Sequence, residues 1–245
     1  MTTPTHDHIV RSYDTELARL TGELVTMGEM AASQLDAAMD ALDKRDSLAA
    51  QRVVEKDDLL DAQEDRISED VLRLLALRQP MARDLREVLA ALRIASDIER
   101  IGDYAANVAK RSMTLNLSAP VPLATGLPAL ADVAGEMLHK VLAAYRNRDA
   151  ESAHRVWKRD TELDTLYTGL FRELLTYMLE DPHSITACTH LLFIAKNIER
   201  IGDHATNIAE NVWFVAHAEV LPEKRARHDV PAGPQPVNDG SFGDG

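Results

Sequence analysis

The chain has 245 residues, of which 45% are apolar and 27% charged, and its formal net charge is −13. That length can bury a substantial core in one two-lobed body or in two small domains. The acidic balance excludes general nucleic-acid binding, because an acidic surface repels a phosphate backbone. Aromatic residues make up only 4% while Leu and Ala are abundant, which favours helix-on-helix packing over a β-sandwich.

The sequence also limits the chemistry and the compartment that we expect. Cys188 is the only cysteine, which excludes an intramolecular disulfide and a thiolate zinc site. The N-terminus lacks a basic region followed by an apolar run, so no signal peptide is predicted. No stretch approaches about 18 uninterrupted apolar residues, the length that a membrane-spanning helix needs. We therefore expect a cytoplasmic protein that is not inserted in a membrane and reaches one only through partners.

Prolines fall between the long helical patterns and predict where the helices stop. Residues 1–11 are expected to form a flexible arm. Six helices follow in chain order, at about 12–42, 46–78, 81–115, 129–147, 149–180 and 184–218. Asp46 is the predicted N-cap of the second helix. The segment from Pro222 onward is rich in Gly, Pro, Asn and Asp, so the tail 221–245 is expected to be disordered.

Apolar residues within these segments recur at steps of three and four, the period of an amphipathic helix. The third helix shows this row clearly, at Ala91, Ile94, Ile98, Ile101, Ala105 and Val108. Helices of about 30 residues are about 45 Å long at 1.5 Å per residue. Short connections between such helices make neighbours antiparallel, which predicts three-helix bundles.

An internal repeat divides the chain into two similar halves. Residues 94–109 (IASDIERIGDYAANVA) and 194–209 (IAKNIERIGDHATNIA) are identical at eleven of sixteen positions, and 45–61 matches 148–164. The predicted fold is therefore all-α: a tandem repeat of two three-helix bundles, with six long antiparallel helices and approximate internal two-fold symmetry. The predicted divisions are a first repeat at 12–115, a linker at 116–128 and a second repeat at 129–220.

Acidic motifs at four-residue steps recur in both halves. The candidate ligands are Asp57, Asp61, Glu99, Asp103 and Asn107 in the first half, and Asp160, Asp164, Glu199, Asp203 and Asn207 in the second. Like charges four residues apart cost about 0.2–0.5 kcal/mol on an exposed helix, and more when partly buried. Two neighbouring helices can bring such pairs together, and four converging oxygen donors suit a hard cation. Divalent or trivalent iron, manganese or magnesium fits this donor set, and zinc fits less well.

Glycine occurs in the interior of a predicted helix in each half, at Gly102 and Gly202. Glycine there costs about 1 kcal/mol relative to alanine, so its repetition indicates a close approach of a neighbouring helix. That approach would bring Asp103 and Asp203 within reach of the opposing carboxylates.

Two other interpretations of the acidic motifs remain open. The carboxylates can lie on a solvated helix face, or the adjoining Arg100 and Arg200 can neutralise them in structural salt bridges. His204 stands where the first half has Tyr104. It is either an additional nitrogen ligand of one site or an ordinary histidine on the helix surface.

Catalytic motifs are missing from the sequence. Its three Glu-x-x-His spacings have no counterpart in the other half, which disfavours a ferritin-like di-iron site. There is no GxxxxGK[ST], GxGxxG or GxSxG motif. A protein that is not an enzyme is therefore favoured. A carboxylate-bridged metalloenzyme and a metal-free helical scaffold are the alternatives.

The segments ERIGDYAANVA at 99–109 and ERIGDHATNIA at 199–209 resemble the repeated signature of the PhoU family, accessory regulators of high-affinity phosphate uptake. The segment PMARDLREVLAALRIASDIERIGD, which ends at Asp103, and the N-terminal YDTEL are also similar to that family. The resemblance covers roughly residues 8–220. The segment after Pro222 departs from the family pattern, and no role is assigned to it.

The resemblance implies a cytoplasmic homodimer of two-bundle chains, with metal ions or iron clusters at the ten candidate ligand positions. It also implies a negative regulator of the phosphate-starvation response. Such a protein connects the ATPase subunit of the phosphate ABC transporter to a sensor histidine kinase. Metal occupancy varies across the family, so a metal-free form is compatible with membership.

Overall fold

The computed structural model describes residues 5–78, 83–119 and 126–221, and within these ranges it contains helices and no β-strand. The all-α class predicted from the sequence is confirmed. The predicted disordered tail lies outside the described residues apart from Leu221. The helices are α1 (Thr5–Asp43), α2 (Ser47–Arg78), α3 (Arg83–Leu115), α4 (Gly126–Asn147), α5 (Ala150–Glu180), the short 3-10 helix η1 (Pro182–Ser184) and α6 (Ile185–His217).

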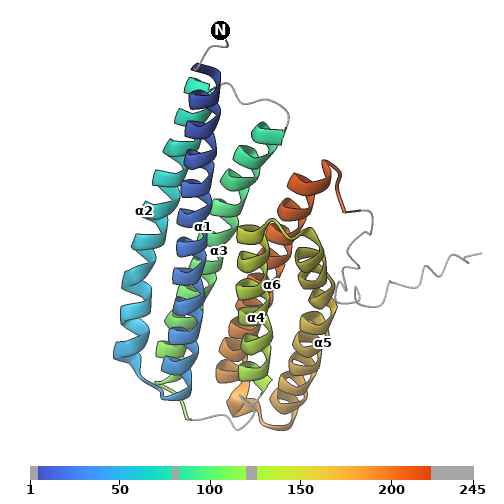
Figure 1. Ribbon diagram of the computed structural model, residues 1–245. Helices are drawn as coiled ribbons and strands as arrows, with labels where there is room; N and C mark the ends of the chain where they lie inside the picture. The colour runs from blue at the N-terminus through green and yellow to red at the C-terminus, as the bar shows by residue number, and fades with distance from the viewer. Residues whose placement is uncertain (1–4, 79–82, 120–125, 222–245) are drawn as a thin grey trace, which may run out of the picture.

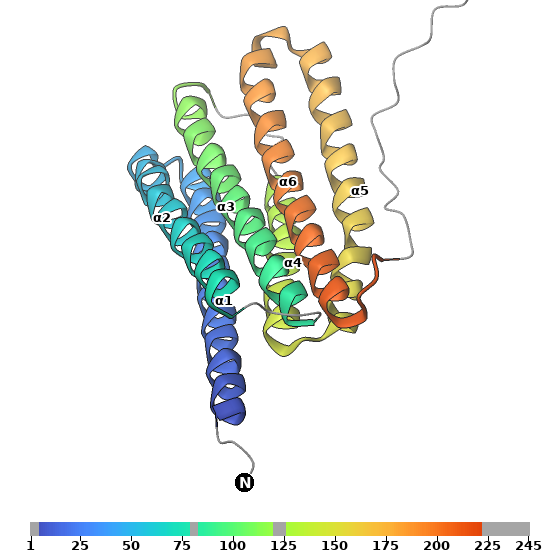
Figure 2. The same ribbon diagram turned by 90° about the horizontal axis from the view of Figure 1, so that it is seen from above.

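The helices form the two predicted three-helix bundles, α1–α3 and α4–α6 (Figure 1). Within each bundle the outer helix, α2 or α5, packs on the other two. Helices α3 and α6 lie side by side at the centre, with α2 and α5 at opposite edges (Figure 2). Helix α1 also contacts α4, so the two repeats share one continuous interface. No helix within the described ranges has the length and apolar character needed to cross a membrane.

An aspartate N-cap starts the second helix of each repeat. Asp46 accepts hydrogen bonds from the backbone N–H groups of Leu48 and Ala49, which confirms the predicted N-cap of α2. Asp149 accepts the backbone N–H of Ser152 at the start of α5. The residue before each cap, Arg45 or Arg148, has a φ of 53°, a left-handed conformation that is uncommon for non-glycine residues.

Two helix starts differ from the prediction. Helix α1 begins at Thr5, inside the predicted arm 1–11, because no proline follows Pro4 before the end of the helix. Helix α4 begins at Gly126, inside the predicted linker 116–128. Pro128, the last residue of the predicted linker, lies in the first turn of α4, where proline is tolerated because the first N–H groups have no partner within the helix.

The apolar rows of all six helices join in one buried core. Leu60 and Leu163, at equivalent positions of α2 and α5, are completely buried. A Cβ atom added to Gly102 would collide with the Leu60 side chain, and one added to Gly202 would collide with Leu163. The predicted close approach at the two glycines is therefore present in both repeats.

Candidate functional site

The five candidate ligands of the first repeat, called the first acidic cluster below, are divided between α2 and α3. Asp57 is only 9% exposed because it faces the core from α2, whereas Asp61 is exposed one turn later. Glu99, Asp103 and Asn107 are partly buried along α3. The Oδ1 atom of Asp57 is buried and has no hydrogen-bond partner. An unsatisfied buried oxygen of this kind costs about 1–3 kcal/mol.

The carboxylates of this cluster act on one another electrostatically. Burial raises the pKa of Asp57 to about 6, and the charges of Asp103 and Asp61 contribute further. Burial likewise raises the pKa of Glu99, with Asp103 as the next cause. The structure therefore brings the α2 and α3 carboxylates into each other's field, as the spacing predicted.

Two basic side chains partly offset this repulsion: Lys110 lowers the pKa of Asp57, and Arg100 pairs with Glu99 and Asp103. The guanidinium of Arg100 lies 3.4 Å from Glu99 Oε2 and donates to Asp103 Oδ2 at 2.9 Å. The predicted neutralising role of Arg100 is present, but its side chain is 54% exposed. A surface pair of this kind contributes about 0–1 kcal/mol.

A further polar neighbour of the cluster, not predicted from the sequence, is Gln34 of α1. Its side chain is 6% exposed, and its Oε1 atom is buried without a hydrogen-bond partner. Gln34 Oε1 and Asp57 Oδ1 lie 3.2 and 3.3 Å from the position that a Cβ atom on Gly102 would occupy. A signal existed in the sequence, because Gln34 lies in step with the apolar residues Ala31 and Ala38.

The second repeat carries the second acidic cluster, formed by its five candidate ligands. Its two most buried members have polar or charged neighbours, although Glu199 Oε2 is buried without a hydrogen bond and only its Oε1 accepts one, from Lys196 at 2.7 Å. Thr206 Oγ1 lies 3.3 Å from Asp160 Oδ1, and Asp160 is 5% exposed. The ammonium of Lys196 lies 2.6 Å from Glu199 Oε2. Burial raises the pKa of Glu199, and the hydrogen bond from Lys196 opposes that shift. Asp164 and Asp203 are partly buried at the edge of this cluster.

Between the two clusters, Asp97 of α3 contacts two side chains of α6. Asp97 Oδ1 lies 2.8 Å from His204 Nδ1 and accepts a hydrogen bond from Asn207 Nδ2 at 3.2 Å. The His204 ring also packs against Tyr104, with 5.6 Å between centroids. Asn207 and His204 therefore contact the other repeat through α3. The guanidinium of Arg200 lies over the Tyr104 ring at 5.5 Å.

The described part of the chain contains no group of three or more His, Cys, Asp or Glu side chains arranged to hold a metal ion. The donor chemistry of the first cluster nevertheless fits a hard cation, because two buried oxygens there, of Asp57 and Gln34, have no donor. The Gln34 oxygen belongs to an amide, which is a ligand type other than His, Cys, Asp or Glu. The assignment of the ten candidate ligands to a metal stays a prediction.

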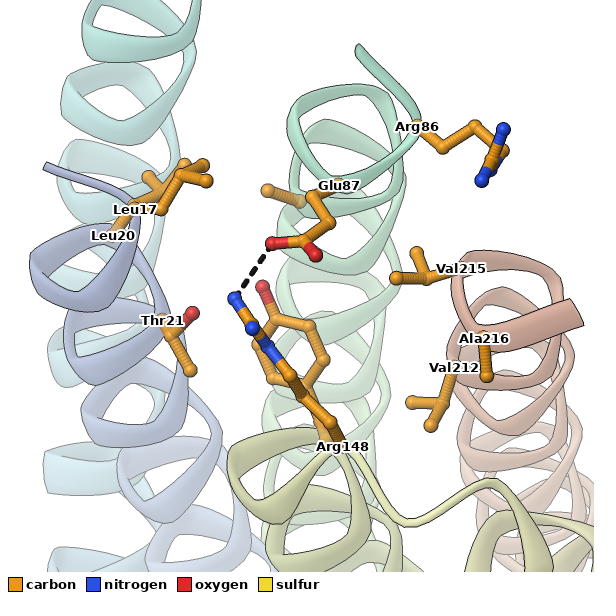
Figure 3. A pocket seen from close by; sticks show the side chains of 11 residues that line it. Leu17, Leu20, Thr21, Arg86, Glu87, Arg148, Val212, Val215 and Ala216 are labelled. Carbon is orange, nitrogen blue, oxygen red and sulfur yellow. Dashed lines mark hydrogen bonds and ion pairs between the residues drawn. The ribbon is translucent and has the colours of Figure 1, made fainter. Parts of the chain in front are cut away.

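A separate cavity of about 210 Å³ lies where α1, α3, α4 and α6 meet. Figure 3 shows Arg148 reaching across it to Glu87, at 2.7 Å, beside Val212 and Val215 of α6. Arg86 also lines this cavity, and its buried Nε has no hydrogen-bond partner. The sequence reasoning did not predict this cavity, because its walls come from four helices that are distant in the chain.

The internal symmetry places a counterpart at the opposite end of the same interface, between the end of α1, the end of α3 and the starts of α4 and α6. That cavity, of about 580 Å³, is lined by the acidic residues Asp36, Asp40, Asp43 and Asp132. The arginine equivalent to Arg148 is Arg45. Its guanidinium donates to three backbone carbonyl oxygens at the end of α3, those of Leu115, Asn116 and Ser118.

Comparison with known proteins gives consistent matches over both repeats. The family model described as "PhoU domain" matches residues 24–112 and 127–212. A Xylella fastidiosa protein named "Phosphate-specific transport system accessory protein PhoU homolog" is 56% identical over 94% of this chain and 97% of its own length. The crystal structure of PhoU from Pseudomonas aeruginosa matches with a TM-score of 0.82 and 36% identity, over 84% of this chain and all of that one. The phosphate transport system regulatory protein PhoU from Streptococcus pneumoniae matches with a TM-score of 0.79 and 28% identity, over 85% and 99% of the two chains.

Proposed function

Because this chain belongs to the PhoU family, a family of accessory proteins and not of enzymes, we propose that it is a negative regulator of the phosphate-starvation response. In this role it restrains high-affinity phosphate uptake when phosphate is plentiful. The observation that carries the proposal is the match of both repeats to the family, at identities of up to 56% over most of the chain.

The proposed mode of action is that of an adaptor in the cytoplasm. One partner is the ATPase subunit of the phosphate ABC transporter, and the other is the sensor histidine kinase of the phosphate two-component system. A duplicated fold supports this role, because it gives one chain two related faces whose surface residues differ. A homodimer, also proposed, would double both faces.

The acidic clusters are proposed to bind divalent or trivalent metal ions. In the first repeat, Asp57 and Asp61 of α2 with Glu99, Asp103 and Asn107 of α3 would hold the cation. A bound cation would neutralise carboxylates that now repel one another, and so would tie α2 to α3. The same assignment in the second repeat includes Asp160, whose Oδ1 lies near the Thr206 hydroxyl, and Glu199, which is paired with Lys196.

The regulatory role is tested by deleting the gene and measuring a phosphate-repressed reporter in phosphate-rich medium. We expect the reporter to become active in the deletion strain, and plasmid-borne wild-type chain to restore repression. A reporter that stays repressed without the gene would contradict the proposal.

The adaptor role needs a separate measurement of association. Purified ATPase subunit and the cytoplasmic part of the kinase are each passed over immobilised chain, with an unrelated helical bundle of similar charge as the control. Specific retention of both proteins is expected. Retention of neither would reject the adaptor role while leaving the reporter result to decide the regulatory one.

A further inference from the structure

The first repeat contains two buried oxygen atoms that need a positive partner. Asp57 Oδ1 and Gln34 Oε1 both lie against Gly102, and both lack a hydrogen-bond donor. The two side chains are 9% and 6% exposed, so bulk water does not solvate them freely. Two adjacent acceptors in such a place repel each other and are each poorly solvated, which makes the pair suited to bind a cation.

The second repeat lacks this arrangement although its backbone repeats the first. The offset of 103 residues that relates Asp57 to Asp160 also relates Gln34 to Met137. Met137 is completely buried, and its terminal carbon lies 3.8 Å from the Cβ position at Gly202. A thioether is a poor ligand for a hard cation, whereas an amide oxygen is a good one.

The two clusters also differ in the basic side chains that neutralise them. Lys196 lies 2.6 Å from Glu199, which is 8% exposed, so the second repeat holds an internal positive charge against a buried carboxylate. The equivalent residue of the first repeat is Ser96. There the positive charge comes from Arg100, which is more than half exposed, and from Lys110, which is exposed and lowers the pKa of Asp57. Exposed side chains of this kind can turn into solvent at little cost.

We infer that the two acidic clusters are not equivalent: the first binds a hard divalent cation more tightly, and Gln34 of α1 is one of its ligands. This inference rests on the proposed metal binding and adds to it a ligand that the acidic motifs do not contain. Because Gln34 lies on α1, the cation would join all three helices of the first repeat. In the second repeat, Lys196 performs part of the neutralisation that a metal performs in the first.

The test exchanges the two equivalent residues. Gln34→Met gives the first repeat the side chain that the second already has, and Met137→Gln is the matched control. Mn²⁺ binding to the purified, metal-stripped full-length chain is measured by isothermal titration calorimetry and by electron paramagnetic resonance. We expect the affinity of the tighter class of Mn²⁺ sites to fall by about tenfold or more in Gln34→Met. This is the scale of the loss when a metal site loses one polar partner. Met137→Gln should leave that class unchanged.

A second variant separates ligation from a hydrogen bond between the Gln34 amide and Asp57. Gln34→Glu adds a carboxylate oxygen in the same place, so a ligand role predicts Mn²⁺ binding at least as tight as in the wild type. Binding that falls as far in Gln34→Glu as in Gln34→Met would overturn the ligand role. Thermal unfolding of each metal-free variant, followed by circular dichroism, identifies any variant that fails to fold.

The remaining outcomes separate this inference from the proposed function. If Asp57→Asn and Asp160→Asn weaken Mn²⁺ binding equally and Gln34→Met does not, the clusters are equivalent and the inference is wrong, while metal binding stands. If the wild type binds no Mn²⁺ in either measurement, both the inference and the proposed metal binding are wrong. The regulatory role is judged independently by the reporter.

Discussion

The two repeats share a backbone but compensate their buried charges differently. In both, a leucine of the outer helix closes on a glycine of the central helix, Leu60 on Gly102 and Leu163 on Gly202. Next to these contacts, Asp57 has an unsatisfied oxygen, whereas the Oδ1 atom of Asp160 lies near a threonine hydroxyl. Packing therefore preserves the duplicated fold, while polar neighbours give each half its own chemistry.

The largest expected effects concern the leucine–glycine contact that the two repeats share. Leu60→Ala and Leu163→Ala each remove a completely buried side chain, so each should lower the free energy of unfolding by about 2–5 kcal/mol. Urea unfolding of the two variants measures these losses. Similar losses would support equivalent packing in the two halves, and a loss below 1 kcal/mol in only one of them would break that equivalence.

An intermediate difference is expected at the turn before the second helix of each repeat. Arg45 donates to three carbonyl oxygens at the end of α3, whereas Arg148 forms one ion pair with Glu87 and is 57% exposed. Arg45→Ala should therefore cost about 1–2 kcal/mol of stability, and Arg148→Ala about 0.5 kcal/mol. Equal losses in urea unfolding would contradict this difference, and added salt should reduce only the smaller one.

The last expected change is a gain and not a loss of stability. Because the pKa of Asp57 is raised to about 6 in the folded protein, the folded state holds this proton more tightly than the unfolded chain does. Its contribution is therefore most favourable below about pH 4 and is lost as pH rises to about 6, where the buried carboxyl ionises. Asp57→Asn should stabilise the metal-free protein by about 1 kcal/mol at pH 7 and flatten the decline between these pH values.

Thermal unfolding across that pH range measures the effect in chelator-treated protein. Asp65→Asn, at an exposed position of the same helix, is the matched control and should leave the profile unchanged. If Asp57→Asn destabilises the metal-free chain at pH 7, the carboxylate is better satisfied than its surroundings in the structure indicate.

Much of the fold could be predicted from the sequence because the signals are local. The three-to-four periodicity and the prolines gave the six helices, and the Asp46 cap was visible as a residue type at a helix start. The glycines predicted the close approach at Gly102 and Gly202. Helix α4 begins before its predicted start because a proline is compatible with a first turn as well as with a stop.

The candidate site was only partly predictable because its partners come from distant segments. The carboxylates of one helix could be placed on a common edge by their spacing. The approach of Gln34 from α1, and of Asp97 from α3 to His204 of α6, depends on how the helices pack. Periodicity fixes the face that a residue occupies, but it does not fix which residue of another helix that face meets.

The inequivalence of the two acidic clusters is tested most directly by a crystal structure of the protein with Mn²⁺, with data collected near the manganese absorption edge. We predict a stronger anomalous peak between Asp57 and Asp103 than between Asp160 and Asp203, with Gln34 Oε1 among the ligands. Peaks of equal height in the two repeats, or a stronger one in the second, would show that the first cluster is not the tighter site.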